Sequence, residues 1–360
     1  MKITTNLTLS PIKTLALVIC MLFLNSCHIN NKPDSSDYVK FSESDFHSSE
    51  KLFGNKITKL KLENPRNIYT IDSLIITVDR KTDFLLHVYS IKTGEKINDL
   101  IPKGEGPFEL LSADYIQTRN REKKILVFGT VEKKVIEFSY SDLTKKNSDI
   151  AFNQFFIKDQ GCLRVMKSGE DYIGLAVRDS LVKRLYIYNN KGQMINAIGN
   201  YPTLVPMVGN MLDAVLFEAF QQISPDGIML IAYRNMDLIE IYDKHYNLKK
   251  KLFGPNGTLP SCQLKSTGTF KTIGFNDDQI NTYGEIVSNP KNDEFWVSYS
   301  GRKLNDKGYL YSKIFVFDSN GSFLKKYELD IPVYKMDVNF KLRKIYALTY
   351  PEMDVYEFKY

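Results

Sequence analysis

The chain has 360 residues, with 48 Lys or Arg against 42 Asp or Glu, and a formal net charge of +6 at pH 7. The basic residues are scattered and never form a dense block, which argues against a nucleic-acid-binding protein. The 22 Tyr and 22 Phe, against one Trp, favour half-buried β-strands. The length is large for one ordinary domain but usual for an all-β repeat protein that folds as one unit.

The first 26 residues have the features of a secretory signal peptide. Lys2 and Lys13 precede an apolar run, Leu15 to Leu24, which ends at the small residue Ser26. The run is shorter than the roughly 20 apolar residues that a membrane-spanning helix needs. The stretch Leu24-Asn25-Ser26-Cys27 is similar to a bacterial lipobox, in which the cysteine becomes the lipidated first residue. We therefore expect a lipid on Cys27 to anchor the exported protein to a membrane.

The segment that follows the cysteine is polar and rich in Ser and Asp. Such a composition predicts a flexible tether over residues 27–50. The folded domain is expected to cover residues 51–360.

A short pattern recurs about every fifty residues. It consists of an apolar residue, any residue, an aromatic residue and a polar residue, and the aromatic positions are Tyr89, Phe138, Tyr188, Tyr242, Phe317 and Phe358. A second hairpin precedes each copy, with β-rich strands over 74–78, 125–128, 172–177, 228–233, 294–299 and 344–349. Each repeat supplies about four strands, the content of one propeller blade. The six copies predict an all-β, six-bladed β-propeller, with two stacked β-sandwiches as the less favoured alternative.

The chain ends predict how the propeller closes. The last copy of the pattern stops at Tyr360, so the sixth blade lacks its outer strand. Residues 56–63 largely alternate apolar and polar, and we expect Ile57, Leu60 and Leu62 to belong to this missing strand. Such pairing would remove an exposed sheet edge.

Three long connections, over 101–114, 199–217 and 253–282, are expected on the face that also carries the loops between second and third strands. The second connection contains apolar residues at helical spacing, which predicts a short helix over 211–220. Four arginines stand at or near the ends of second strands: Arg80, Arg178, Arg234 and Arg302. A ring of arginines on this face would bind an anionic ligand. The alternative interpretation is structural, with Asp79, Asp83, Asp179 and Asp237 neutralising the arginines.

Motifs for catalysis or metal binding are missing from the sequence. It contains no His-x-x-x-His, His-Glu-x-x-His, Cys-x-x-Cys or Gly-x-Ser-x-Gly, and Gly104-Glu105-Gly106-Pro107 lacks the Lys-Ser/Thr of a phosphate-binding loop. We therefore predict no catalytic residue, no metal ligand and no cofactor. Cys162 and Cys262 remain in the mature chain, and the sequence leaves open whether they form a disulfide.

Two short segments carry a resemblance to a known family: Lys103-Gly104-Glu105-Gly106-Pro107-Phe108-Glu109 and Phe253-Gly254-Pro255. With the lipobox and the six repeats, the chain resembles the TolB-like six-bladed β-propeller lipoproteins of Bacteroidetes over most of residues 50–360. Phe108 departs from the family pattern, which has Gly there. The resemblance implies an envelope lipoprotein with no catalytic residues to carry over. His28, in place of Asp after the lipidated cysteine, predicts the outer membrane. No acidic cluster follows Cys27, which favours the periplasmic side over display on the cell surface.

The leading functional hypothesis is a non-enzymatic binding or scaffolding module for a protein, peptide or glycan on the long-loop face. One alternative is an enzyme, a lyase or hydrolase, with its site in the central channel. Another is a purely structural envelope protein. The expected partners are the membrane, through the lipid, and an envelope ligand, but no nucleic acid.

The anchoring prediction can be tested with Cys27→Ser. Because the variant lacks the thiol that accepts lipid, we expect it to lose lipid labelling and to leave the membrane fraction. A processed variant that still sediments with membranes after a high-salt wash would contradict the lipoprotein interpretation.

Overall fold

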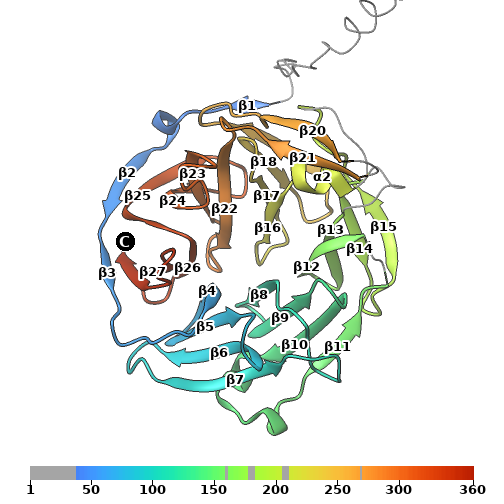
Figure 1. The fold of residues 1–360 in the computed structure, drawn as a ribbon, viewed down its shortest axis with the longest axis vertical. Helices are drawn as coiled ribbons and strands as arrows, with labels where there is room; N and C mark the ends of the chain where they lie inside the picture. The colour runs from blue at the N-terminus through green and yellow to red at the C-terminus, as the bar shows by residue number, and fades with distance from the viewer. Residues whose placement is uncertain (1–37, 159–160, 177–182, 205–210, 268–269) are drawn as a thin grey trace, which may run out of the picture.

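The computed structural model describes residues 38–158, 161–176, 183–204, 211–267 and 270–360. Its strands form six antiparallel blades around a central axis (Figure 1), which confirms the predicted β-propeller. Within the described residues, no helix is long and apolar enough to cross a bilayer.

Every blade contains four strands that pair in order from the axis outward. Blade one consists of β4 (Pro65–Ile71), β5 (Leu74–Asp79), β6 (Phe84–Ser90) and β7 (Lys96–Pro102). Blade two consists of β8 (Tyr115–Arg119), β9 (Lys124–Gly129), β10 (Lys134–Ser139) and β11 (Asn153–Phe156). Blade three consists of β12 (Cys162–Ser168), β13 (Asp171–Ala176), β14 (Leu185–Tyr188) and β15 (Met194–Ile198). Blade four consists of β16 (Ala219–Ile223), β17 (Met229–Tyr233), β18 (Leu238–Tyr242) and β19 (Leu248–Phe253). Blade five consists of β22 (Ile280–Ser288), β23 (Phe295–Lys303), β24 (Tyr311–Phe317) and β25 (Phe323–Val333). Blade six consists of β26 (Lys335–Asn339), β27 (Lys344–Leu348), β28 (Val355–Lys359) and the N-terminal β3 (Gly54–Lys56).

The core is divided into six clusters, one between each pair of neighbouring blades. Because a blade is covered on both sides, its middle strands are buried on both faces: all five residues of β17 and of β18 are buried, including the carboxylate of Glu240. The recurring aromatic pattern of the sequence falls on the third strands, and the predicted β-rich runs fall on the second strands. The repeat was visible in the sequence because this double-sided packing demands the same residue types six times.

The N-terminal segment forms a strap over residues 39–56 that runs along the outer edges of three blades. Its strand β1 (Val39–Lys40) pairs in parallel with β19 of blade four, and β2 (Ser48–Leu52) pairs in parallel with β25 of blade five. Strand β3 then pairs antiparallel with β28 and completes blade six, so the predicted closure by an N-terminal strand is confirmed. Figure 1 shows the strap in blue along the rim, on the side where the C-terminus ends.

The closing strand lies a few residues earlier than predicted. It covers 54–56, and the amide of Ile57 still donates to the carbonyl of Val355, at 2.8 Å. Leu60 and Leu62 leave the blade and pack into the cluster between blades six and one. These apolar residues therefore alternate because they cross an interface, not because they extend the strand.

The prediction of a flexible tether is wrong for residues 38–50, whereas residues 27–37 lie outside the described part of the chain. Phe41 and Phe46 are buried among the aromatic rings of blade five, with centroids 4.9 Å from Phe323 and Phe315 respectively. Between them, the carboxylate of Glu43 binds the ammonium groups of Lys313 and Lys326. The prediction relied on the average composition of the segment, which is polar. Such an average does not detect the two phenylalanines that anchor it.

The predicted long connections join neighbouring blades. The helix in the second one, α2 (Met211–Leu216), is shorter than predicted, because Ala219 and Phe220 already belong to β16. The third connection contains an additional hairpin, β20 (Cys262–Thr267) and β21 (Phe270–Phe275). No bond joins Cys162, which is buried, to Cys262, which is partly exposed in this hairpin.

The strap can be tested with two phenylalanines that differ in burial. Phe46 is 8% exposed and Phe53 is 65% exposed. We expect Phe46→Ala to lower the free energy of unfolding by about 3–5 kcal/mol, because it removes a buried ring and leaves a cavity. Phe53→Ala, on the same strap, should change it by less than about 0.5 kcal/mol. Equal denaturation midpoints for the two variants would show that the strap contributes nothing to stability.

Candidate functional site

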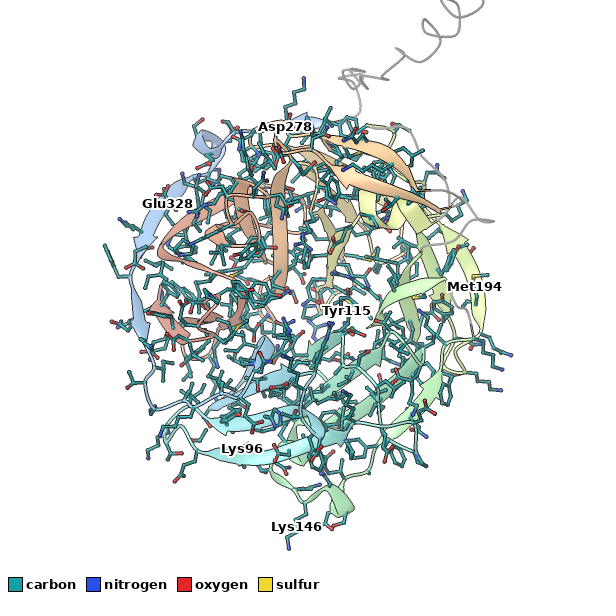
Figure 2. The ribbon with its side chains drawn as sticks, in the orientation of Figure 1. Lys96, Tyr115, Lys146, Met194, Asp278 and Glu328 are labelled. Carbon is teal, nitrogen blue, oxygen red and sulfur yellow. The ribbon has the colours of Figure 1, made fainter. Side chains whose placement is uncertain are left out.

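A cavity of about 630 Å³ lies on the propeller axis, where the innermost strands of all six blades meet. Tyr115 of β8, which lines it, lies near the middle of the ring in Figure 2, whereas Lys96 and Glu328 lie near its rim. This volume suits a small ligand. The innermost strands carry the side chains that converge here, so the chemistry of the cavity depends on their inward positions.

β-Bulges interrupt the innermost strands of blades one, three and five, next to charged residues of the cavity wall. In β4 the register shifts between Pro65 and Asn67 around Arg66, and in β12 it shifts just before Arg164. In β22 it shifts between Tyr283 and Ile286, around Glu285. A bulge turns a side chain away from the regular alternation, and bulges are common beside functional sites.

Three of the five cations that line the cavity are neutralised by acids of the same wall. Arg80 binds Asp114 at 2.7 Å and Arg234 binds Glu218 at 3.0 Å. Lys335 donates to Glu285. Burial would lower the pKa of Lys335, but the charge of Glu285 opposes this and the pKa is raised. These three pairs are internally compensated.

Arg164 differs from the paired cations. Its guanidinium lies between two aromatic rings, 4.2 Å from the ring centroid of Tyr115 and 4.6 Å from that of Phe220. Its side chain forms no ion pair or hydrogen bond with any described residue, although it is half-buried. Contact with the two rings holds the guanidinium in place and leaves its N–H donors available, and such donors are how arginine binds carboxylates and phosphates.

Arg66 adds a second cation without an ion pair to any residue that the structure describes. Its Nε is buried and has no hydrogen-bond partner. Gln221 is 5% exposed and likewise leaves both polar atoms of its side chain unsatisfied. Buried polar atoms without partners are costly, and because protein encloses these atoms, a ligand could satisfy them only if the wall moved.

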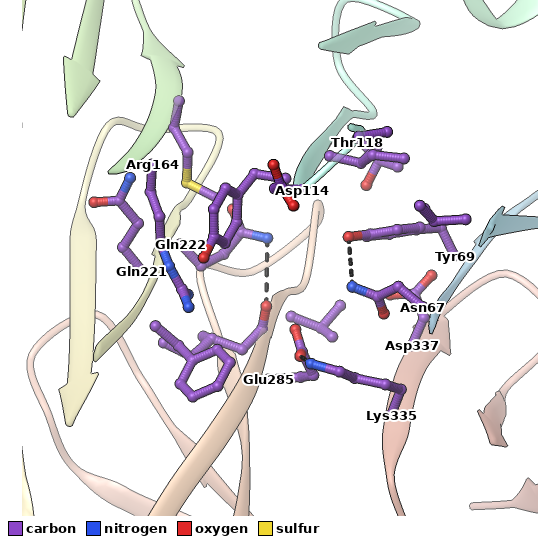
Figure 3. Close-up of a pocket in the computed structure, with 18 of the residues that line it drawn as sticks. Asn67, Tyr69, Asp114, Thr118, Arg164, Gln221, Gln222, Glu285, Lys335 and Asp337 are labelled. Carbon is purple, nitrogen blue, oxygen red and sulfur yellow. Dashed lines mark hydrogen bonds and ion pairs between the residues drawn. The ribbon is translucent and has the colours of Figure 1, made fainter. Parts of the chain in front are cut away.

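The opposite wall is polar and contains one carboxyl that titrates in an accessible range. Figure 3 shows Arg164 and Gln221 on one side of the pocket, with Asn67, Tyr69, Lys335 and Asp337 facing them. Asn67 donates to the Tyr69 hydroxyl at 2.8 Å. Burial raises the pKa of Asp337 to about 6, although hydrogen bonds from the amide and hydroxyl of Thr70 act in the opposite direction.

The structure brings together only part of the predicted arginine ring. Arg80 and Arg234 line the cavity, but each is paired, and their partners are Asp114 and Glu218, not the neighbouring aspartates that the sequence suggested. Arg302 lies at the end of β23 and is not among the lining residues. Arg178 lies outside the described residues. A binding role for these four arginines stays a prediction.

Arg164 and Arg66 were not predicted from the sequence. The predicted arginine ring lies at the ends of second strands. Arg66 and Arg164 instead lie at the start of innermost strands, next to a bulge that affects the direction of their side chains. A signal was present in the sequence: a charged residue stands among apolar residues in the first strand of a repeat, as in Cys162-Leu163-Arg164-Val165. The bulge itself is a tertiary feature that the sequence pattern did not show.

The comparison with known proteins agrees with this architecture. The family model described as TolB-like 6-blade propeller-like matches residues 40–341. The chain belongs to this family. Its fold is similar to that of a Bacteroides fragilis protein described as exported, with a TM-score of 0.53 and 11% identity over 89% of this chain and 99% of that chain. A member of the DUF4221 family from Bacteroides vulgatus is similar too, with a TM-score of 0.53 and 7% identity over 86% of this chain and 96% of that one.

At these identities, the two structural resemblances concern the fold alone. Among proteins with curated descriptions, none matches this chain in sequence. The function of this TolB-like propeller therefore has to be argued from its own cavity.

Asp337 predicts how the stability of this TolB-like propeller depends on pH. Its pKa is 3.8 in a model peptide and about 6 in the folded protein, so the folded state holds the proton more tightly. The contribution of this group to stability is therefore complete below about pH 4 and is lost as the pH rises through about 6. We expect Asp337→Asn to remove this loss, so that the variant gains stability relative to the wild type as the pH rises from about 4 to about 6.

Chemical denaturation at a series of pH values measures this difference. Asp277→Asn, at an exposed position, serves as the matched control and should follow the wild-type curve. Parallel curves for Asp337→Asn and the wild type would rule out the raised pKa.

Proposed function

We propose that this protein is a lipid-anchored envelope binding module that takes the carboxylate of a small ligand into its central cavity. The observation that carries the proposal is Arg164, a half-buried guanidinium stacked between Tyr115 and Phe220 with no acidic partner among the described residues. Because no acid of the described wall pairs with this cation, an anionic ligand can form a charge-assisted hydrogen bond with it without first breaking an ion pair.

The cavity also supports a choice of ligand size and type. Its volume of about 630 Å³ fits a ligand the size of a short peptide or a disaccharide. The side chains of Asn67 and Tyr69 line the same cavity and supply polar groups. Tyr115 and Phe220 supply aromatic surface. An acidic sugar and a peptide with a free C-terminus both satisfy this combination, because each presents a carboxylate next to hydroxyl or amide groups.

The carboxyl groups of the cavity wall already have ion-pair or hydrogen-bond partners, which favours a binding role over catalysis. Asp114, Glu218 and Glu285 are each occupied by a cation, and Asp337 accepts two hydrogen bonds from Thr70. A lyase or hydrolase needs a carboxylate free to move a proton at the reacting bond. Paired acids are better suited to holding the cavity in one shape.

Location in the envelope rests on the leader sequence. The lipobox-like Leu24-Asn25-Ser26-Cys27 supports export and lipid anchoring, and the similar Bacteroides fragilis protein is described as exported. A propeller held close to a membrane by its N-terminal end could present its cavity to ligands that cross the envelope. The outer membrane, facing the periplasm, is our proposed site.

The proposal can be tested by titrating the protein with matched pairs of charged and neutral ligands. The pairs are glucuronate against glucose, and a dipeptide with a free C-terminus against its C-terminal amide. We expect binding by calorimetry for at least one charged member and at least tenfold weaker binding for its neutral partner. Binding of both members with equal affinity, or of neither, would contradict the proposal.

Variants then identify the residue responsible. Arg164→Gln should weaken binding of the charged ligand by about tenfold or more, since a hydrogen bond to a charged group contributes roughly 1.5–3 kcal/mol. Arg302→Gln is the same substitution outside the cavity and should leave the affinity unchanged. If Arg80→Gln and Arg234→Gln abolish binding while Arg164→Gln does not, the site is the arginine ring, and the proposed role of Arg164 is wrong.

A further inference from the structure

Blade one contains a cluster of potential metal ligands that is separate from the central cavity. One ligand atom from each of Glu63, Asp79 and His87 lies within 4.8 Å of the other two. None of these residues lines the cavity. No metal ligand was predicted from the sequence because histidines are few and show no ligand spacing, and only the folded sheet brings these three together.

The sheet register explains why they meet. His87 of β6 pairs with Thr77 of β5 and with Asp99 of β7, so these three side chains share one face of the blade. Asp79 is two residues after Thr77 and lies on that same face. Glu63 belongs to the segment between the strap and β4, in which Leu60 and Leu62 pack between blades six and one.

His87 is oriented as a metal-ligating histidine is. Its Nδ1 is bound to a carboxylate oxygen of Asp99 at 2.5 Å, and Lys96 holds the other oxygen of Asp99 at 3.1 Å. Metal-bound histidines usually make such a second contact, which fixes the ring and leaves Nε2 to the metal. The Nε2 atom lies 3.1 Å from the Thr82 hydroxyl oxygen, and that hydroxyl donates to the carbonyl of Phe84. A metal on Nε2 would therefore have to displace the Thr82 hydroxyl from this nitrogen.

Asp79 is a buried carboxylate that forms no ion pair with any lysine or arginine among the described residues. It is 1% exposed, and its two oxygens accept hydrogen bonds from the amides of Asn64 and Lys81, at 2.8 and 2.9 Å. Each oxygen keeps one lone pair, which is the donor that a metal needs. Burying a charge without a counter-charge is unfavourable, and a cation would remove that cost.

We propose that Glu63, Asp79 and His87 bind a divalent first-row transition metal, with zinc as the best fit. One imidazole nitrogen and two carboxylate oxygens suit zinc and its neighbours, whereas calcium and magnesium prefer oxygen ligands alone. The two carboxylates neutralise the double charge. Bonds of about 2.0–2.2 Å require the ligand atoms to lie closer together than 4.8 Å, and Glu63 is free to approach because its side chain is 47% exposed. Lys96, 3.4 Å from Glu63, would release it on binding.

The place of this site gives the metal a structural role. Glu63 belongs to the segment through which the chain leaves the strap and enters blade one, whereas Asp79 and His87 belong to blade one itself. A metal that joins them would tie the closing segment to the first blade. A ligand that binds only the folded state raises its stability, so the thermal midpoint should rise with metal concentration.

The experiment starts with the mature, chelator-treated protein and titrates it with Zn²⁺, Mg²⁺ and Ca²⁺ by calorimetry, with thermal unfolding in parallel. We expect one equivalent of Zn²⁺ to bind with micromolar or tighter affinity and to raise the thermal midpoint. Cobalt(II) should give the visible absorption of a site with nitrogen and oxygen ligands. Failure of Zn²⁺ to bind at 100 µM, or binding of Ca²⁺ in preference to Zn²⁺, would overturn the proposal.

Variants at several positions, both exposed and buried, show which residues bind the metal. Glu63→Gln changes a half-exposed side chain that is not expected to affect folding, and it should weaken Zn²⁺ binding at least tenfold. His87→Gln should abolish the cobalt spectrum, and Asp99→Asn should weaken binding about 10–100-fold through the orientation of His87. His245→Gln, in an exposed turn of blade four, is the matched control and should bind normally. Unchanged binding in Glu63→Gln and His87→Gln, or a loss in His245→Gln, would show that the metal binds elsewhere.

Discussion

The short antiparallel pairing of β3 with β28 is the contact on which the rest of the molecule depends. Without it, the sixth blade has three strands and an open outer edge, and the first and last blades are joined only by side chains. The pairing covers Gly54–Lys56 only, which is too few residues to be stable alone. The strap lengthens this contact by pairing in parallel with blades five and four and by burying Phe41 and Phe46. Closure is therefore shared among three blades.

Closure also creates the cavity, because six innermost strands converge only in a closed ring. The bulges in β4, β12 and β22 lie beside Arg66, Arg164 and Glu285, three of the charged residues that line the cavity. Most of the charges collected there cancel in pairs, so the fold avoids the repulsion of several buried cations. Arg164 is held by two aromatic rings in place of an acid, which stabilises the cation and keeps it available to a ligand.

The sequence was sufficient for the architecture and insufficient for the sites, for physical reasons. Blade interfaces repeat six times and require the same aromatic and β-branched residues each time, so Tyr89, Phe138 and their equivalents could be recognised. The strap repeats nothing, and the anchors Phe41 and Phe46 stand in a polar segment. Arg164 depends on a local register shift, and the cluster of Glu63, Asp79 and His87 depends on cross-strand register. Neither the register shift nor the cross-strand register can be recognised from the spacing of residues along the sequence.

Native-state hydrogen exchange tests the central role of closure most directly. The measurement follows the amides of β3 and β28 and those of β5, deep in blade one, at increasing denaturant concentrations. If closure holds the ring together, β3 and β28 will exchange only in the global unfolding reaction, with the same free energy and denaturant dependence as β5. Exchange of β3 and β28 through a separate opening of low free energy, while β5 stays protected, would show that the propeller persists without its closing strand and would contradict the central role of closure.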